Sequence, residues 1–90
     1  MTKADIVKEI AQKTGIDKEV VLQVVEGTMK SIKDSIARGH AVYLRGFGSF
    51  IIKRRAKKIG RNISQNTTII IPAHKVPAFK PSASFIKKLN

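Results

Sequence analysis

Two stretches before residue 40 alternate apolar and polar positions with the period of an α-helix. In the first, Thr2 is suited to cap a helix whose third residue is Asp5, and Gly15 marks its end. In the second, Asp17 is the expected N-terminal cap and Gly39 the expected end. The apolar stripes are Ile6, Val7, Ile10 and Ala11 in the first stretch and Val21, Val24, Val25, Met29, Ile32 and Ile36 in the second. The pattern predicts two antiparallel helices joined by a short turn.

After residue 40 the apolar positions follow the pattern of β-strands. Residues 41–44 and 49–52 predict two strands, with a turn and a buried aromatic at 46–48. Residues 67–71 are β-branched throughout and predict a return strand after a turn at 65–66. This part of the chain is therefore predicted to form antiparallel strands, which makes the fold class α+β.

Prolines and a serine shape the end of the chain. Pro72 and Pro77 bracket the exit of the return strand, and because proline has no N–H to donate, they predict an edge strand or an irregular path. After Pro81, Ser82 is suited to cap a short final helix that contains Phe85, Ile86 and Leu89. We expect one domain over residues 1–90, with a helical hairpin and first strand in 1–45, strands in 46–81, and the final helix in 82–90.

Charge is distributed very unevenly along the chain, whose net charge is +12. Residues 1–45 contain eight Lys or Arg and six Asp or Glu, whereas residues 46–90 contain ten Lys or Arg and no acid. Six of the nine residues in 53–61 are basic. A block of like charge repels itself, and a polyanion is the partner that relieves the repulsion. The sequence therefore predicts a nucleic acid as partner, ahead of an anionic membrane surface.

The basic block occupies both faces of a predicted strand. Lys53, Arg55 and Lys57 alternate onto one face, whereas Arg54 and Lys58 alternate onto the other. A strand charged on both faces cannot lie across a core. Residues 53–76 are therefore expected to project as a β-hairpin arm, whose outgoing limb of about ten residues at roughly 3.3 Å each would reach about 30 Å.

The rest of the chain is small for its apolar content. It has no cysteine, so a disulfide or a thiolate metal site cannot supply stability. The apolar side chains of Val24, Val25, Met29, Phe47, Phe50 and Phe79 exceed what two helices and a short sheet can hide. We therefore expect a dimer in which the second copy covers these groups.

Three segments resemble one family of proteins. They are Gly46-Phe47-Gly48-Ser49-Phe50, Gly60-Arg61-Asn62 and the run from Ile71 to Pro81, Ile-Pro-Ala-His-Lys-Val-Pro-Ala-Phe-Lys-Pro. The chain resembles the HU and integration host factor family of bacterial histone-like proteins over its whole length, most nearly the HU type. The resemblance implies a helical hairpin, a three-stranded antiparallel sheet with a long arm, a short C-terminal helix, and an intertwined dimer whose arms enter the minor groove of DNA.

The resemblance also implies which residues bind DNA. On the arm, the family's contacts match Lys53, Arg55, Lys58 and Arg61, with Asn62 beside the tip and Lys75 on the return limb. At the base of the arm they match Lys80, and on the helical body Lys3. Phe47, Phe50 and Phe79 match the packed aromatic core of the dimer. The implied function is bending, wrapping and compaction of double-stranded DNA, largely without sequence specificity.

The arm tip departs from the family pattern. Ile63 stands where the family has a proline that wedges between base pairs. Isoleucine is also an apolar wedge but lacks the fixed φ of proline, so the sequence leaves open whether Ile63 wedges or packs at the tip. Ser82 and Ala83 replace a usual Gly-Lys pair, which removes one positive charge from the body.

Other functions fit the sequence less well. His40 and His74 are far apart in sequence, and the chain has no cysteine that could act with them. All six acids lie in the first part of the chain. An enzyme, a metal site and a cofactor are therefore not expected. A basic module that binds RNA or the ribosome is the alternative, but the arm has no aromatic residue for stacking bases. No segment is apolar enough to span a membrane. We expect a cytoplasmic, nucleoid-associated homodimer, and a heterodimer with a paralogue stays open.

Overall fold

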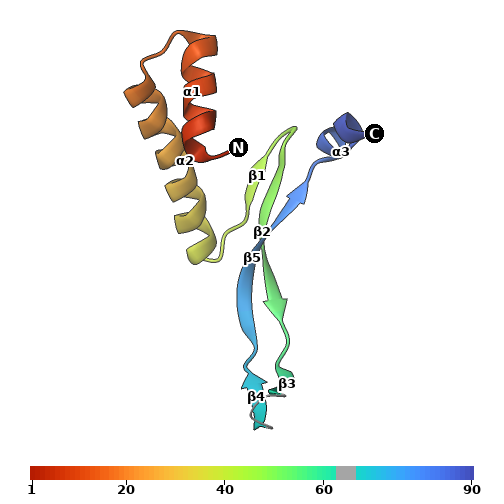
Figure 1. The fold of residues 1–90 in the computed structure, drawn as a ribbon. Coiled ribbons are helices and arrows are strands. Elements are labelled where there is room, and N and C mark those ends of the chain that lie inside the picture. Colours follow the sequence, from red (N-terminus) through yellow and green to blue (C-terminus); the bar gives the residue numbers. More distant parts are fainter. Residues whose placement is uncertain (63–66) are drawn as a thin grey trace. The chain divides into compact units, whose positions relative to one another are not determined.

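The computed structural model describes residues 1–62 and 67–90, and its contacts divide the chain into two compact units. The first unit is Met1–Asp34 and the second is Ser35–Asn90. Each unit is described by itself below, and the course of the chain can be followed in Figure 1.

The first unit is a pair of helices with well-defined ends. Helix α1 covers Lys3–Thr14 and helix α2 covers Lys18–Ala37, the last turn of which belongs to the second unit. Thr2 and Asp5 form the predicted capping box at the start of α1, and Gly15 ends α1 with a φ of 73°. Asp17 accepts a hydrogen bond from the Glu19 backbone N–H at 3.1 Å, as expected of an N-terminal cap.

The apolar stripes of the two helices contribute the two buried apolar side chains of the described residues. Val7 of α1 is 2% exposed and Val21 of α2 is 4% exposed. The remaining apolar residues of α2 stay accessible, and Val24 is 63% exposed. The helical unit on its own therefore has a very small core.

The second unit contains five strands and a short helix. The strands are β1 (Val42–Leu44), β2 (Gly48–Arg55), β3 (Lys58–Asn62), β4 (Thr67–Ile71) and β5 (His74–Pro81), and the helix is α3 (Ala83–Leu89). Strands β1, β2 and β5 form an antiparallel sheet in that order, and β3 pairs with β4 in a two-stranded ribbon (Figure 1). Strand β5 is an edge strand, as its prolines predict.

The turn between β1 and β2 requires glycine at two positions for different reasons. Gly46 has a φ of 80°, which other residues adopt only with strain. Gly48 is buried, and a Cβ there would lie 2.6 Å from the carbonyl oxygen of Lys80 and from a ring atom of Phe79. The turn therefore brings the start of β2 directly against the end of β5.

All four phenylalanines lie together on the second unit. The ring centroids of Phe47 and Phe79 are 5.0 Å apart, as are those of Phe50 and Phe79, and Phe47 lies 5.5 Å from Phe85 of α3. Ser82 caps α3 and donates its backbone N–H to the carbonyl of Phe47 at 2.9 Å. This aromatic cluster fixes α3 to the turn at the base of the sheet.

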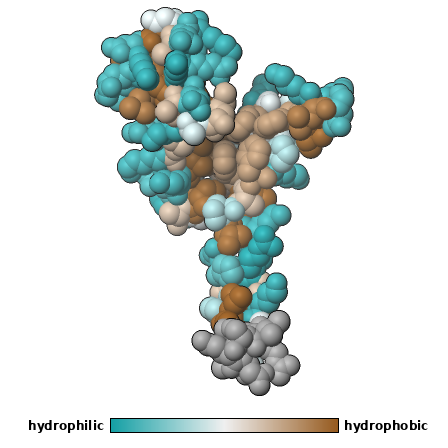
Figure 2. All heavy atoms as spheres, viewed as in Figure 1, coloured by the Kyte–Doolittle hydropathy of each residue, from teal (hydrophilic) through white to brown (hydrophobic). Residues whose placement is uncertain are grey.

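The aromatic cluster is only partly buried. Phe47 is 45% exposed and Phe79 is 39% exposed. Figure 2 shows apolar atoms on the visible surface of the sheet and of α3. Burying such large rings is worth about 2 kcal/mol each, so this surface favours contact with a second copy, as the sequence predicts.

The long hairpin differs from the sequence prediction in one respect. We expected one uninterrupted outgoing limb, but β2 ends at Arg55 and β3 begins at Lys58, opposite the break between Ile71 and His74. Pro72 lies in this break and has no N–H for the ladder. The register is the same on both sides of it, with Arg55 opposite His74 and Lys58 opposite Ile71.

Candidate nucleic-acid interface

The register of the hairpin sorts the basic residues of the arm onto two faces. We call the described residues within 53–76 the arm. Arg54 is opposite Lys75, and Lys58, four residues further along, shares their face. Lys53, Arg55 and Lys57 alternate onto the other face, where Arg55 is opposite His74. Both faces of the arm are therefore basic, as the sequence predicts.

Two successive rungs of the arm place basic side chains directly opposite each other. These are the rungs Arg54–Lys75 and Arg55–His74, of which the first joins two permanent charges at neutral pH. Like charges on opposite positions of an antiparallel pair are destabilising, since their side chains lie only about 5 Å apart. Residues 46–90 include no acid that could neutralise these cations. An external anion between these side chains would relieve the repulsion.

Three of the six acids of the chain form ion pairs on the helices. Within residues 1–62 and 67–90, the ion pairs join Lys3 to Glu26, Lys13 to Glu9, and Lys30 to Asp34, at 2.9, 3.0 and 2.9 Å. The side chains of Lys53, Arg54, Arg55, Lys57, Lys58 and Lys75 are exposed. The cations of the arm are thus accessible to a ligand from solvent.

Lys3 lies in a different setting from the arm residues. It is the first residue of α1, and its Nζ donates to Glu26 Oε1 of α2 at 2.9 Å. The two side chains are 48% and 52% exposed, so the pair is accessible to water and salt. A phosphate that binds Lys3 must compete with Glu26, and no local sequence pattern predicts this ion pair.

The remaining predicted site residues fall at the two ends of the hairpin. Lys80 is exposed and lies opposite Ser49, in the sheet rather than on the arm. The backbones of Arg61 and Asn62 belong to β3, opposite Thr68 and Thr67. Ile63 lies outside the described residues, as does the predicted turn at 65–66. The structure therefore describes the base of the arm and its strands out to Asn62 and Thr67.

Sequence reasoning left two arm residues out of the site. Arg54 shares a rung with Lys75, and Lys57 lies between Arg55 and Lys58 in the break of the ladder. Both side chains are exposed. The signal was present in the sequence, because both belong to the two-faced basic block, but they matched no contact of the resembled family.

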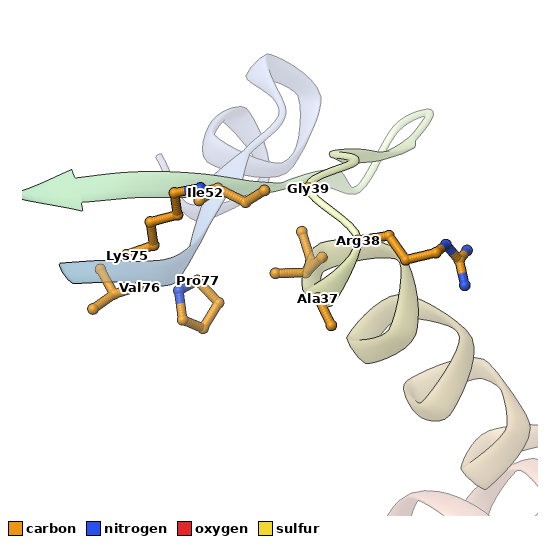
Figure 3. Close-up of a pocket in the computed structure, with 8 residues that line it drawn as sticks. Ala37, Arg38, Gly39, Ile52, Lys75, Val76 and Pro77 are labelled. Atoms are coloured by element: carbon orange, nitrogen blue, oxygen red, sulfur yellow. The ribbon is translucent and has the colours of Figure 1, made fainter.

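A cleft of about 350 Å³ lies where the end of α2 meets the sheet (Figure 3). Its walls are formed by Ile52, Val76 and Pro77 of the strands and by residues 36–39. Lys75 is at the rim, and the side chain of Arg38 points away from the strands. The lining has the cations Arg38 and Lys75 and no carboxylate.

The described part of the chain has no other arrangement typical of catalysis or metal binding. No three His, Cys, Asp or Glu side chains within it lie close enough to hold a metal ion. His74 is on the arm, with Nδ1 3.0 Å from the carbonyl oxygen of Pro72. No described helix is long and apolar enough to cross a membrane.

Comparison with known proteins decides the family. The family model for bacterial DNA-binding proteins matches residues 1–90. The chain belongs to this family. Integration host factor subunit alpha of Anaeromyxobacter sp. (strain Fw109-5) is 36% identical over 90 residues, which are 100% of this chain and 91% of that protein. The DNA-binding protein HU of Thermus thermophilus is also 36% identical, over 100% of this chain and 93% of that protein.

Solved structures agree with this assignment. The cocrystal structure of Anabaena HU with DNA has a TM-score of 0.93, with 34% sequence identity over 99% of this chain and 97% of that chain. The α+β fold with a helical hairpin, a hairpin arm and a short C-terminal helix is therefore confirmed.

Family membership settles several of the expectations from the sequence. The chain is a DNA-binding protein of the HU and integration host factor family, and this family consists of structural proteins rather than enzymes. The alternative of an RNA-binding or ribosome-associated module finds no support. The family functions as dimers, in agreement with the exposed aromatic cluster of the single chain.

Proposed function

We propose that this protein is a histone-like DNA-bending protein whose dimer grips the minor groove of double-stranded DNA with two arms, largely without sequence specificity. The proposal rests on one observation above all: the arm has basic residues on both faces, cation opposite cation, and no acid. Residues 1–90 act as one DNA-binding domain that wraps and compacts DNA in the nucleoid of the cytoplasm.

Most of the affinity comes from the release of counterions. Each Lys or Arg that neutralises a phosphate frees condensed cations from the duplex, which favours binding without reading base sequence. If about eight phosphates are neutralised per dimer, the logarithm of the affinity falls with the logarithm of salt concentration at a slope of about −7. About four contacts per chain then come from the basic residues of the arm, which are Lys53, Arg54, Arg55, Lys58, Arg61 and Lys75.

The body of the protein adds weaker contacts along the flanks of the bound DNA. Lys80 contacts phosphates near the base of the arm, and Lys3 does so after exchanging Glu26 for a phosphate. Asn62 lies beside the tip and contacts base edges in the minor groove. Because the minor groove presents a degenerate pattern, the preference is for deformable DNA over any fixed sequence.

The dimer is a homodimer in which the second copy covers the aromatic cluster. Within the cluster, Phe47 and Phe79 stay 45% and 39% exposed on one chain. Their burial offsets the entropy of association and makes the dimer the folding unit. Sedimentation of the purified protein at micromolar concentration should show a dimer of two identical chains. A stable folded monomer would contradict this assignment.

The groove that the arms occupy is tested with base analogues. Inosine in place of guanine removes the amino group from the minor groove and leaves the hydrogen-bonding groups of the major groove unchanged. Affinity for an inosine-substituted duplex should rise several-fold, because the groove is cleared and the duplex deforms more easily. The matched control is 7-deazaguanine, which alters only the major groove and should change nothing. Sensitivity to 7-deazaguanine alone would place the arms in the major groove.

Ile63 is the residue proposed to unstack base pairs at the arm tip. An apolar side chain inserted between base steps kinks the duplex, and isoleucine is among the residues that do so. Ile63→Ala should reduce the bend measured by energy transfer between fluorophores at the two duplex ends, while most of the affinity remains. An unaltered bend would assign Ile63 to packing at the tip.

A further inference from the structure

The distal ribbon of the arm contains an exposed apolar pair. Ile59 of β3 is directly opposite Ile70 of β4, so both side chains project from the same face. They are 69% and 59% exposed, although each is a large β-branched hydrocarbon. Figure 2 shows brown apolar side chains on the visible face of this ribbon, next to the grey residues. A two-stranded ribbon has no core of its own that could bury such a pair.

The apolar pair continues a line of cations. The register is unchanged across the break in the ladder, so Ile59 has the same strand parity as Lys53, Arg55 and Lys57. Arg61, two residues beyond Ile59 in β3, has the same strand parity again. The apolar pair therefore lies within a line of basic positions along the arm.

We propose that the Ile59–Ile70 pair is an apolar DNA-binding site, which packs against the hydrocarbon walls of the minor groove of double-stranded DNA. This inference rests on the proposed function of the arm. The walls of the groove are formed by the C–H groups of deoxyribose between the phosphates. Cations that neutralise phosphates and isoleucines that cover sugars are thus complementary to successive parts of the same groove.

The charge around the pair selects DNA over a second copy of the chain as its partner. Lys57 and Lys58 immediately precede Ile59, and Arg54 and Lys75 form the basic rung further down the arm. Two arms brought together through their isoleucines would also bring these cations together, which costs free energy. A polyanion with apolar walls meets both parts of the surface favourably.

The two kinds of contact differ in their response to salt. Phosphate contacts set the slope of affinity against salt concentration, because they release counterions. Apolar burial releases none, so it raises affinity by the same factor at every salt concentration. The contribution of the isoleucine pair is therefore separable by experiment from that of the basic residues.

The experiment compares two double variants of the same shape. Valine and threonine are both β-branched and differ by one methyl against one hydroxyl, so Ile59→Val/Ile70→Val is the matched control for Ile59→Thr/Ile70→Thr. The threonine variant should bind a linear duplex about tenfold more weakly than the valine variant, with an unchanged salt slope. Cross-strand contacts between residues 59 and 70 in NMR spectra verify that the ribbon stays paired. Ile70→Thr against Ile70→Val, with Ile59 retained, repeats the comparison if the double variant loosens it.

Equal affinity of the threonine and valine variants would overturn the proposal, as would a difference that appears only in self-association of the protein without DNA. Failure of the underlying function has a separate signature. Lys53→Gln/Arg55→Gln should flatten the salt slope whatever the isoleucines do. If this charge variant leaves both affinity and slope unchanged, the arm is not the DNA-binding element and the isoleucine proposal falls with it.

Discussion

The helical unit and the arm use charged side chains in opposite ways. On the helices, Lys3, Lys13 and Lys30 each have a carboxylate within 3.0 Å, and the ends of α1 are capped. On the arm, Arg54 is opposite Lys75 and no acid is near in sequence. The helices thus neutralise part of their own charge, whereas residues 46–90 have no acid with which to do so. We therefore attribute the unfavourable pairing on the arm to its proposed function rather than to its folding.

The largest effect is expected from an acid placed on the arm. Arg54→Glu turns the Arg54–Lys75 rung into an opposite-charge pair, which stabilises the free arm by a few tenths of a kcal/mol or more. Two cations per dimer become two anions, so affinity for a linear duplex at low salt should fall by about 100-fold. Fluorescence anisotropy measures this, with Arg54→Gln as the control of intermediate effect. Retained affinity in Arg54→Glu would remove this rung from the interface.

A smaller effect, on stability alone, is expected at the base of the sheet. Gly48→Ala places a Cβ 2.6 Å from the backbone oxygen of Lys80, so the strands must separate. The free energy of unfolding should fall by about 1–3 kcal/mol in urea titrations at fixed protein concentration. Gly60→Ala is the control, because the nearest atom to its Cβ is 3.9 Å away. If both variants unfold alike, the close contact at Gly48 does not determine stability.

The cap of α1 should contribute less. Thr2→Ala removes the hydroxyl that accepts from the Asp5 backbone N–H at 3.3 Å. Loss of such a cap lowers the free energy of unfolding by about 1 kcal/mol. The salt slope of DNA binding should stay the same, since no cation is lost. A changed slope would mean that the helix ends take part in the interface.

The same cap gives a pH dependence. Hydrogen bonds from the backbone N–H and hydroxyl of Thr2, at 2.9 and 3.0 Å, lower the pKa of Asp5 below its ordinary 3.8. The stabilisation from ionised Asp5 is therefore complete above pH 3.8 and is lost as the pH falls through the lower folded pKa. NMR titration of Asp5 should show this lowered pKa, and Thr2→Ala should raise it. An unchanged pKa in the variant would assign the shift to the backbone N–H of residue 2 alone.

The smallest effect is expected at Lys3, the helical residue that is predicted to bind DNA as the arm cations do. Glu26→Gln leaves Lys3 without its carboxylate, so that Lys3 becomes a free cation like those of the arm. Affinity for a duplex long enough to reach the body should rise by about twofold to fivefold at low salt, because an exposed ion pair is worth little. Short duplexes that reach only the arms serve as the control. A fall in affinity would mean that Glu26 orients Lys3 toward DNA.

The sequence predicts the helices well because their signals are local. Thr2, Gly15 and Asp17 each act within one helical turn, and the structure has all three as predicted. The strands and their edges are also indicated by local residue types, such as the β-branched run in β4 and the prolines of β5. Local hydrogen bonding and sterics decide these features, so a single sequence is sufficient for them.

Features that depend on pairing between distant residues were harder to predict. The rung Arg54–Lys75 and the ion pair Lys3–Glu26 join residues 21 and 23 positions apart, which periodicity does not reveal. The break between β2 and β3 follows from Pro72 on the opposite limb rather than from any residue within the outgoing limb. The basic block itself was recognisable from composition, but its arrangement into rungs required the register.

The most direct test of the account is the salt dependence of binding to a linear duplex. The logarithm of affinity for the unmodified protein should fall with the logarithm of salt concentration at a slope of about −7, and Lys53→Gln/Arg55→Gln should flatten it to about −3.5 as four phosphate contacts per dimer are lost. A shallow slope for the unmodified protein, or an equal slope for both proteins, would contradict the claim that the acid-free arm binds the DNA backbone.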